Sequence, residues 1–494
     1  MRVTNSMVYA SVIRNTNDAL ARYYALNEQN ASEKRINRPS DDPAGAATVL
    51  ALRNHLAALE QYQENIDLAS AALAAADDAL ATVSELITGA KEKAEQGATG
   101  TLSAGQREML AGEVRQLMEQ MLVQANTEYM GDSIFAGQNT DGDAYALALA
   151  ADVSGPTLSG ADVASITGDS AHSVRVEFLD SGTVGGAADL GYRWSADGGQ
   201  TWTTATLAAG DTALAQGSCS VALASGAAVS GEADAAGQSA LVVRPAALYL
   251  GDAKDGAVVR HAGSSPVSAA ASGVFSARVT VRIDADTTLA GAVAYSYSTD
   301  GGASWVAGNS ASGGVLTVPG GTLTLAPDGG ADLFAGDQFT LVPEQADIAV
   351  NISDASPVVI NNVGKDIFGG LYQAPGAASA DAVPGANLFE TMGRLVAALE
   401  TGDVDGVGQS LEDLDAAQER VLRGAASVGA RETTVRNVEA ASVLRKEADT
   451  RLMSAVEDAD LVTLMTRLQA AQTAYTSVVE TSAEIMTLSM ADLL

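Results

Sequence analysis

The sequence has 494 residues, enough for about two to four domains, and its 61 Asp and Glu against 28 Lys and Arg give a net charge of −33. Such a surface repels nucleic acid and anionic lipid. A single cysteine, Cys219, excludes an intrachain disulfide. The N-terminal stretch lacks the apolar core of a secretory signal, and no run of roughly 18 apolar residues predicts a membrane span.

The first predicted element is an amphipathic helix with a three-four spacing. Its seam comprises Ala10, Ile13, Asn17, Leu20, Tyr24, Asn27 and Ala31. Two asparagines interrupt this seam, and polar residues in a seam fix register at a cost in stability. The helix is therefore either a surface helix with a narrow stripe or a helix that meets several partners.

A sharp turn follows within KRINRPSDDPAGAA, residues 34–47. Pro39 and Pro43 exclude a continuous helix, whereas Asp42 is suited to cap a new helix that has Pro43 at its first position. We interpret this corner as a set of turn and interface residues rather than a charged active site. The set comprises Arg35, Asn37, Arg38, Pro39, Ser40, Asp41, Asp42 and Pro43.

The strongest periodic pattern comes next. Large aliphatic residues recur at steps of seven: Leu52, Leu59, Ile66, Leu73, Leu80 and Ile87. This repeat predicts a helix of about 50 residues. After a break at residues 97–103, a further helix is expected with Leu110, Val114, Leu117 and Met121 on one face. Short connections favour antiparallel neighbours.

The middle of the chain is rich in Gly, Ala, Ser, Thr and Asp and has short alternating runs, which predict β-strands. It contains a repeat: YRWSADGGQTW at 192–202 returns as YSYSTDGGASW at 295–305. Two similar β modules, at about 172–245 and 275–344, are the simplest account.

Helical periodicity resumes near Asn387. It continues with Leu388, Met392, Leu395 and Leu399, then Val407, Leu414, Val421, Val428 and Val435, and finally Leu461, Leu464, Leu468, Ala471, Tyr475, Val478, Ser482 and Ile485. The predicted fold is α+β: a long antiparallel helical bundle formed by both termini, with an inserted all-β central region of two similar modules. The expected domains are 1–145 (helical), 146–385 (β-rich) and 386–494 (helical, packing with the first).

The repeated motif resembles the Asp-box of sialidases and other β proteins. Its members are Ser195, Asp197, Gly199, Thr201 and Trp202, and in the second copy Ser298, Asp300, Gly302, Ser304 and Trp305. Asp and Gly suit a tight hairpin turn, the hydroxyls can bond turn amides, and Trp can pack under the loop. In that resemblance the box is structural, so it gives little support to glycosidase chemistry.

Candidate chemistry is otherwise absent from the sequence. His55, His172 and His261 have no Cys or His at metal-ligand spacing, and residues 139–143 lack the full calcium-loop pattern. The acidic pair Asp41 and Asp42 is interpreted as capping, and the acidic groups at 77–78 and 457–460 as solvated faces. We therefore expect no enzyme, no cofactor and no metal.

Several of these stretches resemble the bacterial flagellin superfamily. They are the opening MRVTNSMVY, the corner at 35–45, residues 134–141, 350–352 with 366–369, 387–399, and 457–461 onward. Together they lie within about 1–145 and 346–494. Inside the superfamily they are most similar to the subgroup that joins the flagellar hook to the filament, and the tail MADLL also favours that subgroup over filament flagellin.

The resemblance implies a structural subunit at the hook-filament junction, outside the cell, exported through the flagellar channel without cleavage of a signal peptide. The implied partners are other copies of itself in a ring, the other junction protein, flagellin and a cytoplasmic export chaperone, with no nucleic acid and no membrane insertion. Filament flagellin is the alternative, and a secreted carbohydrate-binding or sialidase-like protein is a distant one. The enlarged region 146–345 departs from the family pattern.

Overall fold

The computed structural model describes residues 5–99, 102–234, 237–252, 257–273, 275, 277–343, 346–373 and 379–491. The opening residues 1–4, the last residues 492–494 and Glu344, which belong to the expectations above, lie outside this described part. The chain divides into two compact units. One contains residues 1–67, 351–356 and 435–494, and the other contains 68–350 and 357–434.

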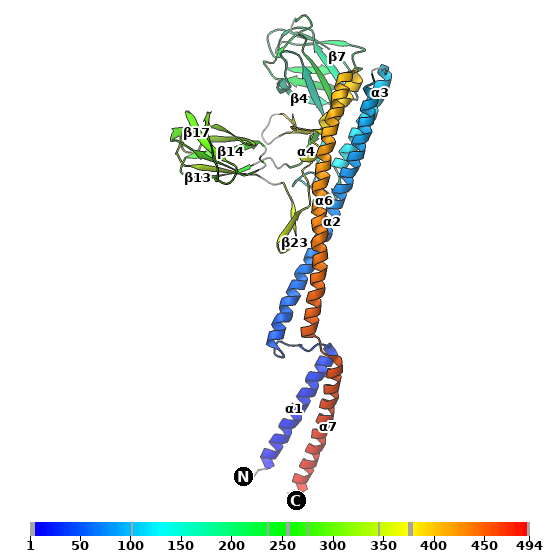
Figure 1. Cartoon of the computed structure of the whole chain (residues 1–494), viewed down its shortest axis with the longest axis vertical. Helices are drawn as coiled ribbons and strands as arrows, with labels where there is room; N and C mark the ends of the chain where they lie inside the picture. Colours follow the sequence, from blue (N-terminus) through cyan, green and yellow to red (C-terminus); the bar gives the residue numbers. More distant parts are fainter. Residues whose placement is uncertain are drawn as a thin grey trace. The chain divides into compact units, whose positions relative to one another are not determined.

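The predicted mixture of helix and strand is confirmed (Figure 1). The helices are α1 (Asn5–Ser32), α2 (Pro43–Gly97), α3 (Ala104–Ala125), α4 (Gly364–Ile367), α5 (Leu388–Thr401), α6 (Val404–Glu457) and α7 (Leu461–Ala491), with a short 3-10 turn at Gly160–Asp162. The sevenfold repeat predicted a helix of about 50 residues, and α2 has 55.

In the first unit, α1 and α7 pack side by side along their length (Figure 1). The seam expected on α7 is its least exposed face, apart from Leu461, which is 46% exposed. Tyr23 of α1 stacks on Tyr475, with ring centroids 6.4 Å apart. Leu464, at the start of this seam, is only 4% exposed.

The seam predicted for α1 is not the face that packs on α7. Ile13 and Tyr24, two of its members, are 59% and 61% exposed. The face toward α7 carries Thr16 and Tyr23 instead. Adjacent faces of a helix differ by a shift of one residue, and α1 has apolar side chains on both, so spacing alone could not select between them.

In the second unit, the seam residues Leu73, Leu80 and Ile87 of α2 are completely buried. Val421 and Val428 of α6 are also completely buried. The Lys91 ammonium of α2 pairs with the Asp415 carboxylate of α6, which lies at the rim of the same contact. Burial every second turn is what the sevenfold spacing predicted.

The strands lie between α3 and α5 in the chain. The earlier strands are β1 (Glu128–Tyr129), β2 (Asp132–Ser133), β3 (Tyr145–Ser154), β4 (Val163–Gly168), β5 (Val174–Phe178), β6 (Gly182–Thr183), β7 (Leu190–Ser195), β8 (Thr203–Leu207), β9 (Ala213–Gln216), β10 (Cys219–Leu223), β11 (Ala228–Val229) and β12 (Ala240–Tyr249). The later strands are β13 (Ala257–Ala262), β14 (Val267–Gly273), β15 (Val279–Ile283), β16 (Thr287–Thr288), β17 (Ala292–Ser298), β18 (Val306–Ser312), β19 (Val315–Val318), β20 (Gly321–Pro327), β21 (Asp332–Leu333), β22 (Gln338–Pro343), β23 (Ala349–Ser353), β24 (Ser356–Val359), β25 (Leu371–Tyr372) and β26 (Asp381–Ala382).

Strands β3–β12 form a first strand group and β13–β22 a second strand group, and the two groups pair their strands in the same order; β25 and β26 join the large sheet of the first group. The first large sheet runs β26-β25-β12-β5-β7-β8, with β3 also paired to β12, and the second runs β13-β22-β15-β17-β18. Each is accompanied by a three-stranded sheet, β4-β10-β9 or β14-β20-β19, and by a two-stranded one, β11-β6 or β16-β21. Each group encloses its own hydrophobic core, one around Val176, Phe178 and Leu241 and the other around Val281, Phe339 and Leu341.

These sheets extend beyond the module boundaries expected from the sequence. β3 and β4 precede residue 172, and β13 and β14 precede residue 275, yet all four pair with strands inside those boundaries. Strand pairing over long separations has no local sequence period, so the repeated turn identified each module's centre better than its edges.

Candidate functional site

The corner between α1 and α2 is a turn built on two carboxylates. Asp41 accepts hydrogen bonds at Oδ2 from the backbone N–H groups of Asn37 (3.0 Å) and Arg38 (2.8 Å). Asp42 accepts one at Oδ1 from the N–H of Gly45 (3.0 Å), which makes it the N-cap of α2. Helix α2 begins at Pro43, and Pro39 and Ser40 lie exposed in the turn.

The corner is joined to the break between α6 and α7. The Arg35 N–H donates to the Glu457 carbonyl oxygen at 2.7 Å, and the Arg35 guanidinium donates to the Val456 carbonyl at 2.7 Å. The Ala459 N–H donates to the Glu33 carbonyl at 3.0 Å. We call residues 33–35 and 456–459 the corner clasp. It ties the two chain breaks of the first unit to each other.

A buried carboxylate lies at the centre of the corner clasp. Glu457 is 4% exposed, and its side chain pairs with the Lys34 ammonium at 2.5 Å and with the Arg53 guanidinium of α2. Interpreting the acidic group 457–460 as a solvated face was therefore wrong for Glu457. The cations that neutralise it are distant in sequence, and no local spacing reveals them. Asp460, in the same group, caps α7 by accepting from the Val462 N–H at 3.1 Å.

The other corner residues have local partners. The Arg38 guanidinium pairs with Glu28 of α1 at 2.8 Å, and both side chains are about half exposed or more. Arg35 lies 3.7 Å from the Asp42 carboxylate. These bonds fix the turn. The role of the corner as an interface between subunits stays a prediction.

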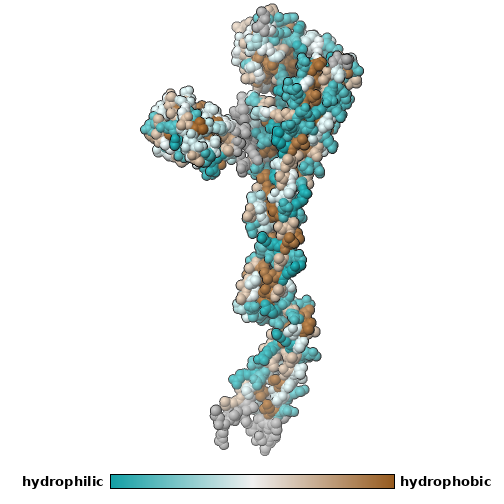
Figure 2. Space-filling view, in the orientation of Figure 1, coloured by the Kyte–Doolittle hydropathy of each residue, from teal (hydrophilic) through white to brown (hydrophobic). Residues whose placement is uncertain are grey.

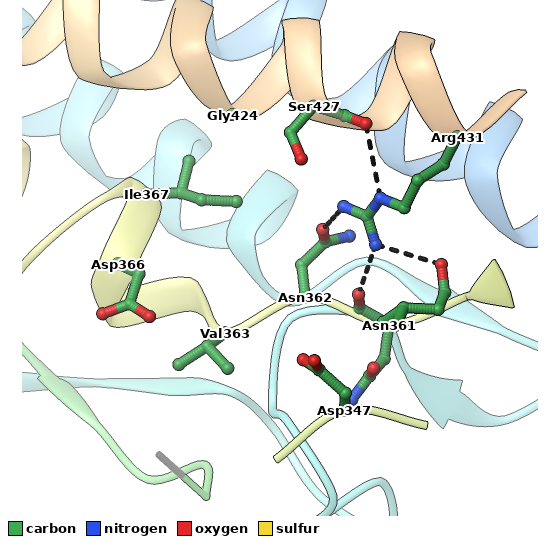
Figure 3. Close-up of a pocket in the computed structure, with 10 residues that line it drawn as sticks. Asp347, Asn361, Asn362, Val363, Asp366, Ile367, Gly424, Ser427 and Arg431 are labelled. Atoms are coloured by element: carbon green, nitrogen blue, oxygen red, sulfur yellow. Dashed lines mark hydrogen bonds between the residues drawn. The ribbon is translucent and has the colours of Figure 1, made fainter. Parts of the chain in front are cut away.

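A second polar site lies in the other unit, where α6 passes the segment around α4 (Figure 3). Its cavity of about 280 Å³ is lined by Asp347, Val359, Asn361, Asn362, Val363, Asp366, Ile367, Gly424, Ser427 and Arg431. The Arg431 guanidinium donates to the carbonyl oxygens of Val359 and Asn361, each at 3.0 Å, and to Asn362 Oδ1 at 2.5 Å. Burial lowers the pKa of Arg431 from its usual value.

The residues that flank the second strand group are bonded here, one to Asn361 and the other to Ala136, whose neighbour Gly137 is also bonded to Asn361. Asn361 Nδ2 donates to the carbonyl oxygens of Gly137 (2.6 Å) and Ala346 (2.7 Å). The Asp252 N–H donates to the Ala136 carbonyl oxygen at 2.8 Å. Each of these hydrogen bonds links two segments that are separate in the sequence, so we interpret the site around Arg431 as a structural junction. Arg431 and Asn361 could not be found from the sequence, because most of their partners are backbone groups, which leave no pattern of residue types.

The two Asp-boxes form matching turns. In the first, Ser195 Oγ accepts from the Gly199 N–H at 2.9 Å, and Asp197 accepts from the Thr201 N–H at 2.9 Å and from its hydroxyl at 2.6 Å. In the second, Ser298, Asp300, Gly302 and Ser304 repeat this arrangement. These bonds lower the pKa of Asp197 to about 2 and that of Asp300 further.

Each box also holds a cation over its tryptophan. The Arg193 guanidinium lies 4.7 Å from the centroid of Trp202, and that of Arg282 lies 4.4 Å from Trp305. The arginine comes from a different strand in each copy, β7 in the first and β15 in the second. The hydroxyls, carboxylates and rings of the boxes are occupied in stabilising the turns, as the resemblance to structural Asp-boxes implies.

The histidines have carboxylate partners rather than metal-site geometry. His55 lies 2.6 Å from Asp449, His172 3.4 Å from Glu400, and His261 3.5 Å from Asp337. Among the described residues, no group of three or more His, Cys, Asp or Glu side chains could hold a metal ion. Within the same part of the chain, no helix is long and apolar enough to cross a membrane.

The N-terminal part of the chain is similar to known flagellar proteins. Residues 3–140 match the bacterial flagellin N-terminal helical region. Flagellar hook-associated protein 3 of Escherichia coli K12 is 32% identical over 142 residues, and that of Salmonella typhimurium LT2 is 31% identical over 142. The matched part of the chain is thus flagellin-like and resembles hook-associated protein 3. Each match covers 28% of this chain, and the chain spans 45% of the length of each relative.

Solved structures of flagellar junction proteins are also similar to this chain. The hook-associated protein 3 of Legionella pneumophila has a TM-score of 0.34 at 15% identity, covering 83% of this chain and 98% of that one. FlgL of Xanthomonas campestris has a TM-score of 0.32 at 15% identity, covering 82% and 99%. The predicted resemblance to the flagellin superfamily is thus confirmed by the sequence match over residues 3–140.

Proposed function

We propose that this flagellin-like chain is a structural subunit of the bacterial flagellum at the hook-filament junction. The observation that carries the proposal is its 32% identity to flagellar hook-associated protein 3 over 142 residues. The relatives are named as flagellar components and none as an enzyme, which accords with turns and junctions whose polar groups are already bonded to each other. The proposed location is outside the cell, after export through the flagellar channel without cleavage of a signal peptide.

Exposed apolar residues on the terminal helices support assembly by these helices. Val462 and Met465 of α7 are 79% and 56% exposed, and Met7, Ile13 and Tyr24 of α1 are about 60% exposed. Figure 2 shows hydrophobic side chains at the surface along both helices. Burying such residues against neighbouring copies would supply stability that the isolated chain lacks. We also propose that the helices of both termini form one antiparallel bundle and that the corner residues lie at the contacts between copies.

The remaining partners belong to the same proposal. They are other copies in a ring, the other hook-filament junction protein, flagellin and a cytoplasmic export chaperone. Head-to-tail (heterologous) contacts between copies can close into a ring or extend as a helix, and an axial structure can be built in either way.

The central region is proposed to hold two related modules. The matching strand orders and the two Asp-boxes support this reading. We propose module limits near 145–249 and 257–343, wider than the 172–245 and 275–344 expected from the sequence; the pairing of β3 with β12 and of β13 with β22 supports them. The modules lie between the two helical parts, proposed as 1–145 and 386–494.

Deletion of the gene tests the function. Cells without the protein should carry hooks but no filaments and should release flagellin into the medium, and the wild-type gene should restore filaments. Missing hooks, or filaments of normal length, would refute the junction role. A chain that dominates sheared surface protein would instead be filament flagellin. A sialic-acid hydrolase activity that depends on a central-region arginine would support the enzyme alternative.

A further inference from the structure

The second large sheet has an outer face whose counterpart in the first sheet is covered by a helix. In the first sheet, α5 packs on β12, and Arg244 is buried there between Asp152 (2.5 Å) and Glu390 (2.6 Å). No Cβ would fit at Gly393 of α5, because the Pro245 carbonyl oxygen occupies that space. The helix thus lies directly against the backbone of β12.

Register identifies the corresponding residues of the second sheet. Val242 pairs with Arg175 in the first sheet, and Thr340 pairs with Thr280 in the second. With VRVEF (174–178) aligned to VTVRI (279–283), Val342 takes the place of Arg244. Pro343 then takes the place of Pro245. The face of β22 that carries Val342 therefore corresponds to the face that α5 covers on β12.

We call this surface the arginine face. By strand alternation and pairing it comprises Val258, Arg260, Ala262, Thr280, Arg282, Gln338, Thr340 and Val342, of which Thr280 is buried. Val258 is 49% exposed, and Arg260 and Gln338 are exposed. Within the described part of the chain, no helix packs on β13, β15 or β22 as α5 packs on β12.

The charge of this face is opposite to that of the chain as a whole. In the described residues Arg260 forms no ion pair, and Arg282 has one at 3.4 Å, with Asp284. Another arginine, Arg278, lies exposed directly before β15. The chain carries 61 acidic against 28 basic residues, so most of its surface is complementary to these arginines. Arginine forks bind carboxylates in bidentate fashion, and valines beside them add apolar area.

We propose that the arginine face docks on an acidic surface of a second copy of this chain. This deepens the proposed function, because it assigns a contact between neighbouring copies to the central region in addition to the terminal helices. Complementary charge would align adjacent copies and make their contact depend on salt. Arg260 and Arg282 would bind carboxylates of the neighbour, and Val258 and Val342 would be covered on docking.

A photo-crosslinking experiment tests this. Ala262, exposed at the end of β13, is replaced by Cys and labelled with a benzophenone maleimide, while the buried Cys219 is spared. The full chain is irradiated as purified protein at increasing concentration and low salt, and also in flagella sheared from the source bacterium. We expect a crosslink to a second copy, mapped by mass spectrometry to an acidic segment.

Charge reversal provides the specificity control. Arg260→Glu with Arg282→Glu should lower the crosslink yield about tenfold, and the milder pair Arg260→Gln with Arg282→Gln should lower it less. Arg423→Glu, at a residue whose side chain is 68% exposed on α6, should leave the yield unchanged. Circular dichroism checks that each variant is folded.

The outcomes separate this inference from the proposed function. No self-crosslink in solution or in flagella would overturn the inference, even if the protein is found at the hook-filament junction. Binding of heparin that depends on Arg260 and Arg282, without a self-crosslink, would also overturn it in favour of a polysaccharide ligand. A self-crosslink by a protein that is absent from flagella would support the inference and refute the proposed location.

Discussion

Glu457 provides the sharpest test of the corner clasp. Replacing it with Gln keeps the shape of the side chain but removes the charge that pairs with Lys34 and Arg53. Each charge-assisted contact contributes about 1.5–3 kcal/mol when fully desolvated. The Lys34 and Arg53 side chains are 41% and 52% exposed, so they regain hydration in the variant, and we expect a net loss of about 2 kcal/mol.

The loss should appear as local opening. The amides of Arg35 and Ala459 donate hydrogen bonds across the clasp, so their hydrogen exchange reports its opening directly. A loss of about 2 kcal/mol predicts exchange about 30-fold faster in Glu457→Gln. Glu447→Gln is the matched control. Glu447 also pairs with an arginine, Arg451, but this residue lies one helical turn from it on α6 and both side chains are exposed. Exchange at both amides within threefold of wild type would refute the role given to Glu457.

Three further predictions concern other parts of the chain. Arg244→Met should reduce the free energy of unfolding by about 3–5 kcal/mol in urea titrations, because Glu390 would keep a buried charge without its cation, and adding Glu390→Gln should recover part of the loss. The pKa of Asp197 in the folded state is lowered from its ordinary value of 3.8 to about 2. The stability that the ionised Asp197 contributes is therefore complete above about pH 4 and is lost as the pH falls through about 2. An NMR titration of this carboxyl with a midpoint near 4 would contradict the prediction. Residues 1–40 and 455–494 should be the first segments cut by protease in the purified monomer, and full protection of both would argue against assembly-dependent stability.

The helices were predictable because their burial is periodic. Leu73 and Leu80 of α2 are seven residues apart on a buried face, as are Val421 and Val428 of α6, and the sequence carries that period directly. The same reasoning does not say which face of α1 packs on α7, where Tyr23 faces α7 and Tyr24 is exposed. When a helix carries two adjacent apolar stripes, the sequence does not show which of them is buried, because that depends on the helix that packs against it.

Among the site residues, too, some were predictable from the sequence and others were not. The Asp-box turns and the Asp42 cap were predictable, because their hydrogen bonds join residues within four positions of each other. Glu457 was not, since the Arg53 that neutralises it is 404 residues away in the chain. A buried carboxylate and a solvated one look alike in a sequence until the fold brings their counterions together.

The bonds around Asn361 have a practical consequence. Asp252 and Ala346 lie at the two ends of the stretch that holds the second strand group. Asp252 is bonded directly to Ala136, and the Asn361 side chain donates both to the carbonyl oxygen of Ala346 and to that of Gly137, the neighbour of Ala136. Because the chain leaves and returns at one place, the whole stretch could be shortened, exchanged or replaced by a foreign domain at little cost in loop closure. This position is therefore a natural graft point for displaying a chosen protein on the assembled structure.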